Sequence, residues 1–399
     1  MRSSVVALLK ELVAIQSLSG AEQAAADFAA HRLAAAGLDV ERVGDNVIAH
    51  LVSRGRGRGR APALLFASHL DTVPAGVGWT RDPFAASEEA GRIHGRGAND
   101  AKASVAAMMT ALEDLASHRA RDAAAGTLLL ALTVEEETTN AGIAAVRRHL
   151  VDRGLDGAVV GEPTSLEVVR AQSGLAVLRA EWTGRSCHAA HVARVTHESA
   201  LAKAATELAA AGEWLALDGS HPLLGTSTVT PTIFRAGERA NVVPDRAEAT
   251  FDARLAPPHD AAGAVRALAA RLPSAKVEIR SERLKAVETP ADHPLVVAAL
   301  QAAGRSQAIG SPTLSDMALL GGIPAVKVGP GDTARSHTPD EFVTVDELEA
   351  GFRFYRALAR LALEALSAAP AAGRSPGAAF ASAAGPVAPS RAAASGGAR

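Results

Sequence analysis

The chain has 399 residues, 48% of them hydrophobic and 3% aromatic, and its 41 basic and 43 acidic residues give a formal charge of -2. This length exceeds what one hydrophobic core usually supports, so we expect two domains. The small net charge excludes a general attraction to nucleic acids or acidic membranes. Cys187 is the single cysteine, which excludes a disulfide within the chain and favours a reducing cytoplasm.

The first residues and the hydropathy pattern indicate no membrane partner. Val5 to Leu18 forms an amphipathic segment with charged residues inside it, unlike a secretory signal. No uninterrupted apolar stretch approaches the ~20 residues that are needed to span a bilayer. We therefore expect a cytoplasmic protein without a nucleic-acid or membrane partner.

Strand and helix patterns alternate through the first 160 residues. Apolar residues at three- and four-residue spacing predict two opening helices, at 3–18 and 21–36. The elements expected next are strands at 39–42, 47–52 and 63–67, a helix at 101–118, a strand at 127–133, a helix at 140–152 and a strand at 158–160. This order predicts an α/β fold with a mainly parallel sheet and helices on both of its faces, because crossover connections are right-handed.

Arginine and glycine alternate in the segment 54–60. Such a segment could contact phosphate groups or acidic lipid. A solvated loop between two strands is the favoured interpretation, because no aromatic residues or further basic run surround it.

The pattern changes beyond Gly174 to an alternation of apolar and polar residues, which is typical of half-buried strands. The expected elements are strands at 176–182, 228–234 and 247–254, with helices at 197–211 and 260–271. A helix at 293–304, a strand at 325–328 and a helix at 346–366 then resume the first pattern.

These shifts predict the domain limits. Residues 1–174 and 286–366 would form the two parts of one domain, and 175–285 would form a smaller inserted α+β domain. Residues 367–399 are rich in Ala, Gly, Pro and Ser, which predicts a low-complexity, disordered tail.

Imidazole and carboxylate side chains follow four of the predicted strands. The candidate ligands are His69, Asp71, Asp100, Glu135, Glu136, Glu137, Glu162 and His337. Ligands collect at the carboxyl ends of the strands in open α/β sheets, so these side chains are expected at one edge. Mixed imidazole and carboxylate donors favour zinc, with cobalt or manganese as substitutes.

Each motif has an alternative interpretation. The tripeptide at 69–71 is common in loops, although Asp71 could accept the second ring N–H of His69 and fix its orientation. The three acids at 135–137 would repel one another without a cation, but they would equally suit the first turn of a helix. Glu162 and His337, farther along the chain, could lie in ordinary turns. Their predicted meeting at one sheet edge favours a metal centre.

Five motifs in this order resemble the dinuclear zinc amidohydrolases, which include acetylornithine deacetylase, succinyl-diaminopimelate desuccinylase, aminoacylase and the glutamate carboxypeptidases. The motifs are Ser-His-Leu-Asp-Thr-Val-Pro at 68–74, Gly-Arg-Gly-Ala-Asn-Asp-Ala-Lys at 95–102, Thr-Val-Glu-Glu-Glu-Thr at 133–138, Gly-Glu-Pro-Thr at 161–164 and Ser-His-Thr-Pro-Asp-Glu-Phe at 336–342. Their order and spacing match over roughly residues 5–365.

The resemblance implies two zinc ions. Asp100 would bridge them, with His69 and Glu162 completing one site and Glu137 and His337 the other. It also implies a ferredoxin-like inserted domain that serves as a lid and joins two chains into a homodimer.

The resemblance further implies the catalytic roles. Asp71 would orient His69, and Glu136 would be the general base for the attack of a zinc-bridging hydroxide on an amide carbonyl. Glu135 replaces the aspartate that is usual there. A shift by one residue, with Glu135 as the base and Glu136 as the ligand, is the alternative.

Three residues of the inserted domain match positions that contact substrate. His188 matches a histidine that stabilises the oxyanion in relatives, often from a partner subunit; a polar surface histidine is its alternative interpretation. Asn241 and Arg254 match residues that grip the substrate, and an arginine fork suits a carboxylate. Both could instead be strand-end residues with a structural role.

The implied activity is removal of an N-acyl group from a small-molecule amino acid. N-acetylornithine or a close basic analogue in arginine or lysine synthesis is expected, because residues 328–342 most resemble the acetylornithine and acetylcitrulline deacetylase branch. Succinyl-diaminopimelate desuccinylase is the nearest alternative, followed by dipeptidase and aminoacylase. A metal-binding interaction protein without turnover is the alternative of a different class, and the presence of Glu136 argues against it.

Overall fold

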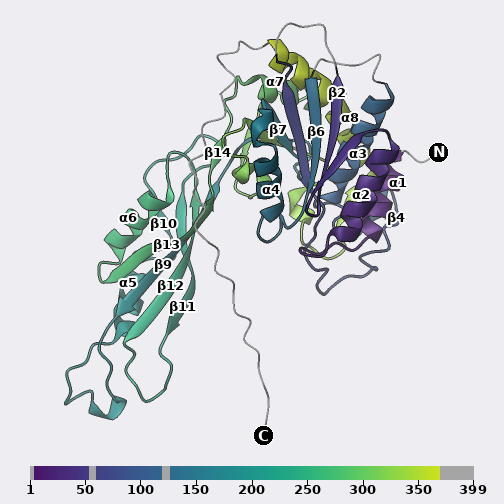
Figure 1. Ribbon diagram of the computed structural model, residues 1–399. Helices are drawn as coiled ribbons and strands as arrows, with labels where there is room; N and C mark the ends of the chain where they lie inside the picture. Colours follow the sequence, from purple (N-terminus) through teal and green to yellow (C-terminus); the bar gives the residue numbers. More distant parts are fainter. Residues whose placement is uncertain (1–3, 54–59, 119–125, 369–399) are drawn as a thin grey trace.

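The computed structural model describes residues 4–53, 60–118 and 126–368, which form two lobes (Figure 1). The predictions for the arginine–glycine segment, apart from Arg60, and for the tail beyond residue 368 lie outside the described residues. None of the described helices combines the length and the apolar character that crossing a bilayer requires.

The larger lobe is built on a nine-stranded sheet with the order β1-β2-β6-β3-β7-β16-β8-β14, in which β15 also pairs with β8. Its strands are β1 (Asp39–Val43), β2 (Asn46–Ser53), β3 (Ala63–His69), β6 (Gly126–Thr133), β7 (Gly157–Val160), β8 (Val169–Gln172), β14 (Val287–Glu288), β15 (Ile309–Ser311) and β16 (Ala325–Lys327). The four central strands β6, β3, β7 and β16 are parallel, whereas β1, β2, β8 and β14 pair in antiparallel fashion toward the edges. The predicted α/β fold is confirmed, and its parallel part is the centre of the sheet.

Helices cover both faces of this sheet (Figure 1). One face packs against α1 (Ser4–Ala14), α2 (Gln23–Ala35), α3 (Lys102–Ser117), α7 (Pro294–Ala303) and α8 (Val345–Ala368), and the other against α4 (Ala141–His149) and the 3-10 turn η3 (Asp316–Leu319). Side chains of β3 alternate between the two cores, because successive residues of a strand point to opposite faces. Leu64 and Phe66 join the first core, and Leu65 and Ala67 join the second.

A three-stranded sheet that the sequence analysis did not predict lies in the same lobe. It consists of β4 (Ser87–Glu89), β5 (Arg92–His94) and β17 (Phe342–Thr344), in the order β17-β5-β4. Phe342 pairs with His94, so residues that are far apart in sequence become neighbours. This pairing fixes the segments just before residue 100 and just after residue 337 relative to each other.

The smaller lobe is an inserted unit that runs from β9 to β13. Its antiparallel sheet has the order β10-β11-β12-β9-β13 and carries two helices. The elements are β9 (Gly174–Thr183), α5 (Ala200–Ala211), β10 (Leu215–Ala216), β11 (Thr228–Ala236), β12 (Arg246–Leu255), α6 (Ala261–Arg271) and β13 (Ala275–Leu284). Trp182 and Phe251 are buried in its separate core. An inserted α+β unit is thus confirmed, whereas the predicted domain limits stay a prediction.

A two-stranded ribbon connects the lobes. Strand β8 continues into β9 after one residue, Ser173, and β13 continues into β14 after two residues. The two lengths of chain pair with each other on both sides of the junction, Leu175 with Leu284 and Gln172 with Val287.

Candidate metal centre

The five predicted metal ligands meet at the carboxyl ends of the parallel strands. His69 ends β3, Glu162 follows β7, and Glu137 lies in the loop after β6. Asp100 precedes α3, and His337 follows the 3-10 turn η4 (Thr333–Arg335) beyond β16. Parallel strands bring their ends to one edge of the sheet, which explains how residues from five segments come together.

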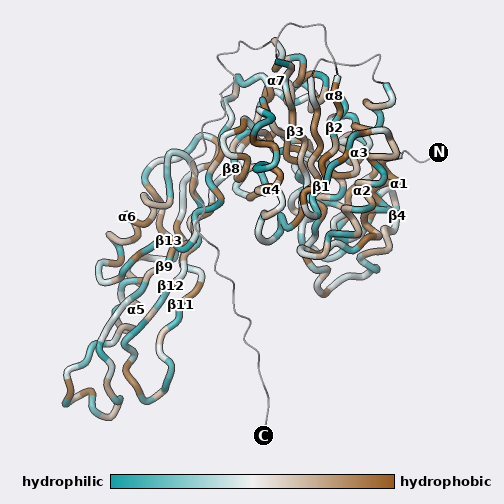
Figure 2. Tube along the Cα trace, viewed as in Figure 1, coloured by the Kyte–Doolittle hydropathy of each residue, from teal (hydrophilic) through white to brown (hydrophobic). Residues whose placement is uncertain are grey.

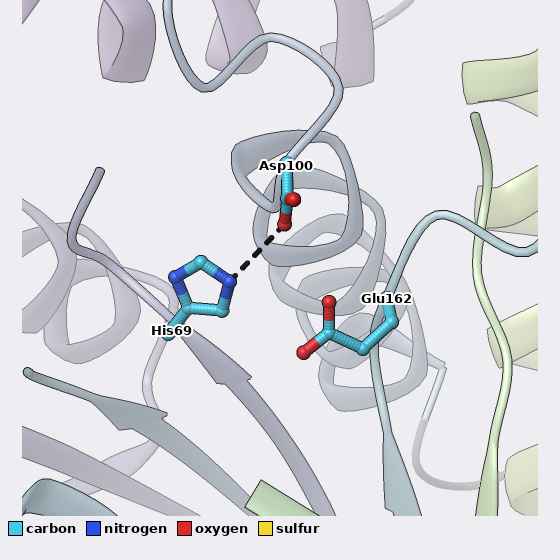
Figure 3. Close-up of side chains that lie close together, drawn as sticks. All are labelled: His69, Asp100 and Glu162. Carbon is cyan, nitrogen blue, oxygen red and sulfur yellow. Dashed lines mark ion pairs between the residues drawn. The ribbon is translucent and has the colours of Figure 1, made fainter. Parts of the chain in front are cut away.

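The ligand atoms fall into two groups that share Asp100. In the first, Nε2 of His69 lies 3.3 Å from Oδ1 of Asp100, and Glu162 completes the group (Figure 3). In the second, Nε2 of His337 lies 2.9 Å from Oε1 of Glu137 and 3.7 Å from Oδ2 of Asp100. Within each group the ligand atoms lie within 4.8 Å of one another. Because the two oxygens of Asp100 face different groups, its carboxylate has the arrangement of a bridging ligand.

Asp71 fixes both the imidazole and the acidic loop. Its carboxylate oxygen lies 3.5 Å from Nδ1 of His69, which also contacts the Asp71 carbonyl oxygen at 3.0 Å. The same carboxylate accepts backbone N–H groups from Glu136 and Glu137 at 3.0 and 3.1 Å, and the hydroxyl of Ser19 at 2.7 Å. Burial opposes ionisation, but the hydrogen bond and charge of His69 lower the pKa of Asp71 to about 2. Asp71 therefore remains an acceptor, which keeps Nε2 of His69 turned toward Asp100.

The charges at this edge suit divalent cations. Burial raises the pKa of the Glu162 carboxyl to about 8, an effect that His69 opposes and Asp100 strengthens. Imidazole nitrogens and carboxylate oxygens are common zinc ligands, and two cations would offset the repulsion between the buried acids. The side chains present therefore fit two metal ions.

Glu136 lies beside the ligands and is half-buried. Burial raises its pKa well above the usual range for a glutamate, His69 opposes this shift, and the nearby charges of Glu162 and Asp316 add to it. Its neighbour Glu137 contacts His337, whereas the Glu135 carboxylate accepts a hydrogen bond from Thr139. These contacts support Glu137 as the ligand, and the role of Glu136 as general base stays a prediction.

Several residues around the site were not singled out by the sequence analysis. Lys327, only 2% exposed, donates to the Ser311 hydroxyl and to both oxygens of Thr313 at 2.9–3.1 Å. Burial lowers the pKa of this lysine, and the negative charge of Glu162 opposes the change. A lysine at the end of an apolar strand was the available signal, because such a position rarely holds an unpaired charge.

A contact from the inserted unit also reaches the acidic loop. Arg283, near the end of β13, donates to the carbonyl oxygens of Thr138 and Thr139 and, at 3.2 Å, to the side-chain oxygen of Asn140. These residues directly follow Glu137, so the inserted unit is attached to the loop that carries two acids of the site.

His188 and Asn241 lie away from the metal ligands of the same chain. The ten-residue strand β9 leaves the first lobe at Gly174 and spans about 30 Å before His188 is reached. There the side-chain nitrogens of His188 and Asn241 lie 3.5 Å apart. Arg254 lies at the near end of β12, opposite Leu175, and donates to both oxygens of Asp252 at 2.8 and 3.2 Å.

Fold and site together define a metal-dependent amidohydrolase. The family described as "Peptidase family M20/M25/M40" matches this chain over residues 65–361, and the chain belongs to this family. The resemblance that the five motifs indicated and the predicted enzyme class are thus confirmed.

Individual relatives agree with this membership. The chain is 36% identical to the succinyl-diaminopimelate desuccinylase of Bordetella petrii over 269 residues, which cover 63% of this chain and 68% of that protein. It is 33% identical to the Dechloromonas aromatica desuccinylase over 293 residues, or 70% and 75% of the two chains. A dinuclear metal-binding peptidase of Bacillus subtilis has the same fold, with a TM-score of 0.69 at 20% identity over 90% of this chain and 98% of that one.

Replacing Asp71 by Asn should weaken metal binding about 10–100-fold, the usual effect of losing a residue that orients a ligand. Each oxygen of the Asp71 carboxylate accepts one backbone N–H group. In asparagine an NH2 group replaces one of these oxygens, so a donor would face the N–H of Glu136 or Glu137. Zinc affinity is measured by competition with a chromophoric chelator. Ser19→Ala, which removes only one hydroxyl contact, is the matched control. Unchanged affinity in Asp71→Asn would contradict the orienting role.

Proposed function

We propose that this chain hydrolyses an N-acyl amide of a diamino acid, with N-succinyl-diaminopimelate as the first candidate substrate. The observation that carries the proposal is the pair of ligand groups that share Asp100 at the edge of a family M20 sheet. The names of the two desuccinylases described above support the succinyl substrate. A place in lysine synthesis would follow from that substrate.

N-acetylornithine is the second candidate. Residues 328–342 resemble the acetylornithine and acetylcitrulline deacetylase branch, which would place the protein in arginine synthesis. The relatives' names give this substrate less support than the succinylated one.

Two zinc ions, or cobalt or manganese in their place, would polarise the amide carbonyl and lower the pKa of a water molecule. His69 and Glu162 would hold one ion, Glu137 and His337 the other, and Asp100 both. Asp71 would keep His69 in the ring orientation that binding requires.

Glu136 would move the proton in this reaction. A glutamate with a raised pKa accepts a proton readily near neutral pH and can pass it to the departing amine. Arg254 and Asn241 would contact the amino-acid part of the substrate, for which Arg254 would exchange Asp252 for a substrate carboxylate.

His188 would act on the site of a second copy of the chain. It lies at the far end of β9, so an oxyanion contact within its own chain would require a large displacement of the inserted unit. A homodimer through this unit fits the apolar side chains that are exposed there. Figure 2 shows hydrophobic residues among the hydrophilic ones along the trace of this unit. Eight of the thirteen large hydrophobic side chains exposed among the described residues belong to it: Val192, Val195, Leu201, Trp214, Ile233, Phe234, Val242 and Ile279.

Strand β11 offers an edge for pairing in such a dimer. Within the described residues, β10 pairs with only Thr228 and Val229 of β11, so the rest of that strand has no neighbour on this side. Exposed strand edges readily pair with another chain. We also propose a cytoplasmic location, which suits a chain with one cysteine.

Replacing Glu136 by Gln should abolish hydrolysis and leave the metal content near two ions per chain. Gln has nearly the same shape but cannot take up a proton, so the loss should exceed the about 100-fold contribution that is typical of a general base. Turnover and metal content are measured on the same preparation, the latter by plasma emission spectrometry. Residual turnover near the wild-type rate would assign the base to another residue.

The substrate is identified by a screen of zinc-loaded protein. The four compounds tested are N-succinyl-diaminopimelate, acetylornithine, acetylcitrulline and acetyl-lysine. N-succinyl-diaminopimelate should give the highest kcat/KM of the four. Amine release is followed with a fluorogenic amine reagent, and chelator-treated protein is the control. A higher value for acetylornithine would select the second candidate, and inactivity on all four would favour a peptidase.

Mixing two inactive variants tests the shared site. Glu136→Gln and His188→Ala chains, unfolded and refolded together, should regain about a quarter of the wild-type kcat, since half of the dimers are mixed and each contains one intact site. Sedimentation checks that the particles are dimers of the 40.7 kDa chain. The absence of recovery in dimeric mixtures would show that His188 does not act across the interface.

A further inference from the structure

A buried carboxylate joins the two segments that carry Asp100 and His337. Glu341 lies four residues after His337, and its side chain is completely buried. Its Oε1 atom accepts the backbone N–H groups of Asn99 and Asp100, both at 2.9 Å. One carboxylate oxygen thus fixes the peptide that carries the bridging ligand.

Arg96 holds the other oxygen of this carboxylate. Its side chain is 2% exposed, and its guanidinium pairs with Oε2 of Glu341. It also donates to the carbonyl oxygen of Ala75 at 3.1 Å and lies 5.2 Å from the centre of the Trp79 ring. With a contact on each oxygen, the Glu341 side chain has little freedom to turn.

Asn99 makes hydrogen bonds between the same segments in both directions. Its side-chain amide donates to the Asp332 carbonyl oxygen at 3.0 Å and to the Ser336 hydroxyl at 3.3 Å. Its side-chain oxygen accepts the backbone N–H of Asp332 at 2.9 Å. The pairing of β5 with β17 continues this junction on the other side of Glu341.

The two ligand groups depend on this junction to different degrees. His69 ends a central strand, and Glu162 follows another, so the sheet itself holds most of the first group. His337 has a left-handed φ of 62°, and its side chain is 51% exposed, so the sheet does not hold it. The contacts of Glu341, Arg96 and Asn99 join the segment that carries Asp100 to the segment that carries His337.

We propose that Glu341 is a positioning residue that holds Asp100 at the separation from His337 that the second ion requires. The inference rests on the proposed function for the identity of the two groups as metal sites. Loss of Glu341 leaves two buried N–H groups without an acceptor, and the peptide at 99–100 must then move to satisfy them. That movement changes the second group more than the first.

The test is a zinc titration of metal-free protein by calorimetry, with wild-type protein and the variants Glu341→Gln and Glu341→Ala. Glu341→Ala should bind the first ion within about threefold of wild type and the second about 10–100-fold more weakly. Glu341→Gln keeps an acceptor oxygen for the two N–H groups but turns an amide toward Arg96, so its loss should be smaller. Should Glu341→Ala fail to fold, Glu341→Gln carries the test, with selective weakening of the second ion still expected.

A matched control separates positioning from stability. Glu113 pairs with Arg32 between α2 and α3, away from the ligands, at 2.7 Å and 3.1 Å. Glu113→Ala should lower the melting temperature of the metal-free protein without changing either affinity.

Two results would overturn the positioning role: equal weakening of both ions, or unchanged affinity for the second. Inactivity on the four amides together with selective loss of the second ion would instead support Glu341 and refute the proposed substrates.

Discussion

The structure depends on the concentration of acidic side chains at one edge of the sheet. Asp71, Asp100, Glu136, Glu162 and Asp316 are all mostly buried there. Buried carboxylates repel one another and lose hydration, so such a cluster opposes folding unless cations offset it. Two imidazoles and a buried lysine supply part of the compensation, and bound metal ions would supply the rest. Such a concentration of buried acidic groups is expected at a functional site rather than at a site that only stabilises the fold.

The sequence allowed the centre of the fold to be predicted, because its strands are continuous apolar runs. The run at 63–67 and the residues that follow it became β3 and the first ligand. Strands β4, β5 and β17 escaped prediction because each has three residues, too few to show a period. β13 was also not predicted, although Ala275, Val277 and Ile279 alternate with charged residues; the alternation ends at the polar run 280–283 in its second half. Of the antiparallel strands toward the sheet edges, β1 and β2 were predicted, whereas β8 and β14, with four and two residues, were not.

The residues of the site were also predictable only in part. The five candidate ligands were identified through ordered motifs, and the structure brings them together. Ser19, Lys327 and Arg283 have partners that are distant in the chain or come from loops, so their contacts arise only in the folded protein. The substrate was not predictable from the motifs, because the residues singled out in them are candidate ligands of the metal ions and a candidate base, not residues that contact the acyl group.

The ribbon between the lobes determines how the protein can move. Since β8–β9 and β13–β14 are hydrogen-bonded to each other across the junction, sliding of one lobe past the other would break backbone pairs, whereas bending of the ribbon would keep them. Bending of the ribbon would therefore displace the inserted unit without breaking these pairs. A bend of about 10° at Ser173 would displace its tip by about 5 Å over a strand of ten residues. A small bend near Ser173 would in this way become a larger displacement beyond the far end of β9, where His188 and Asn241 lie.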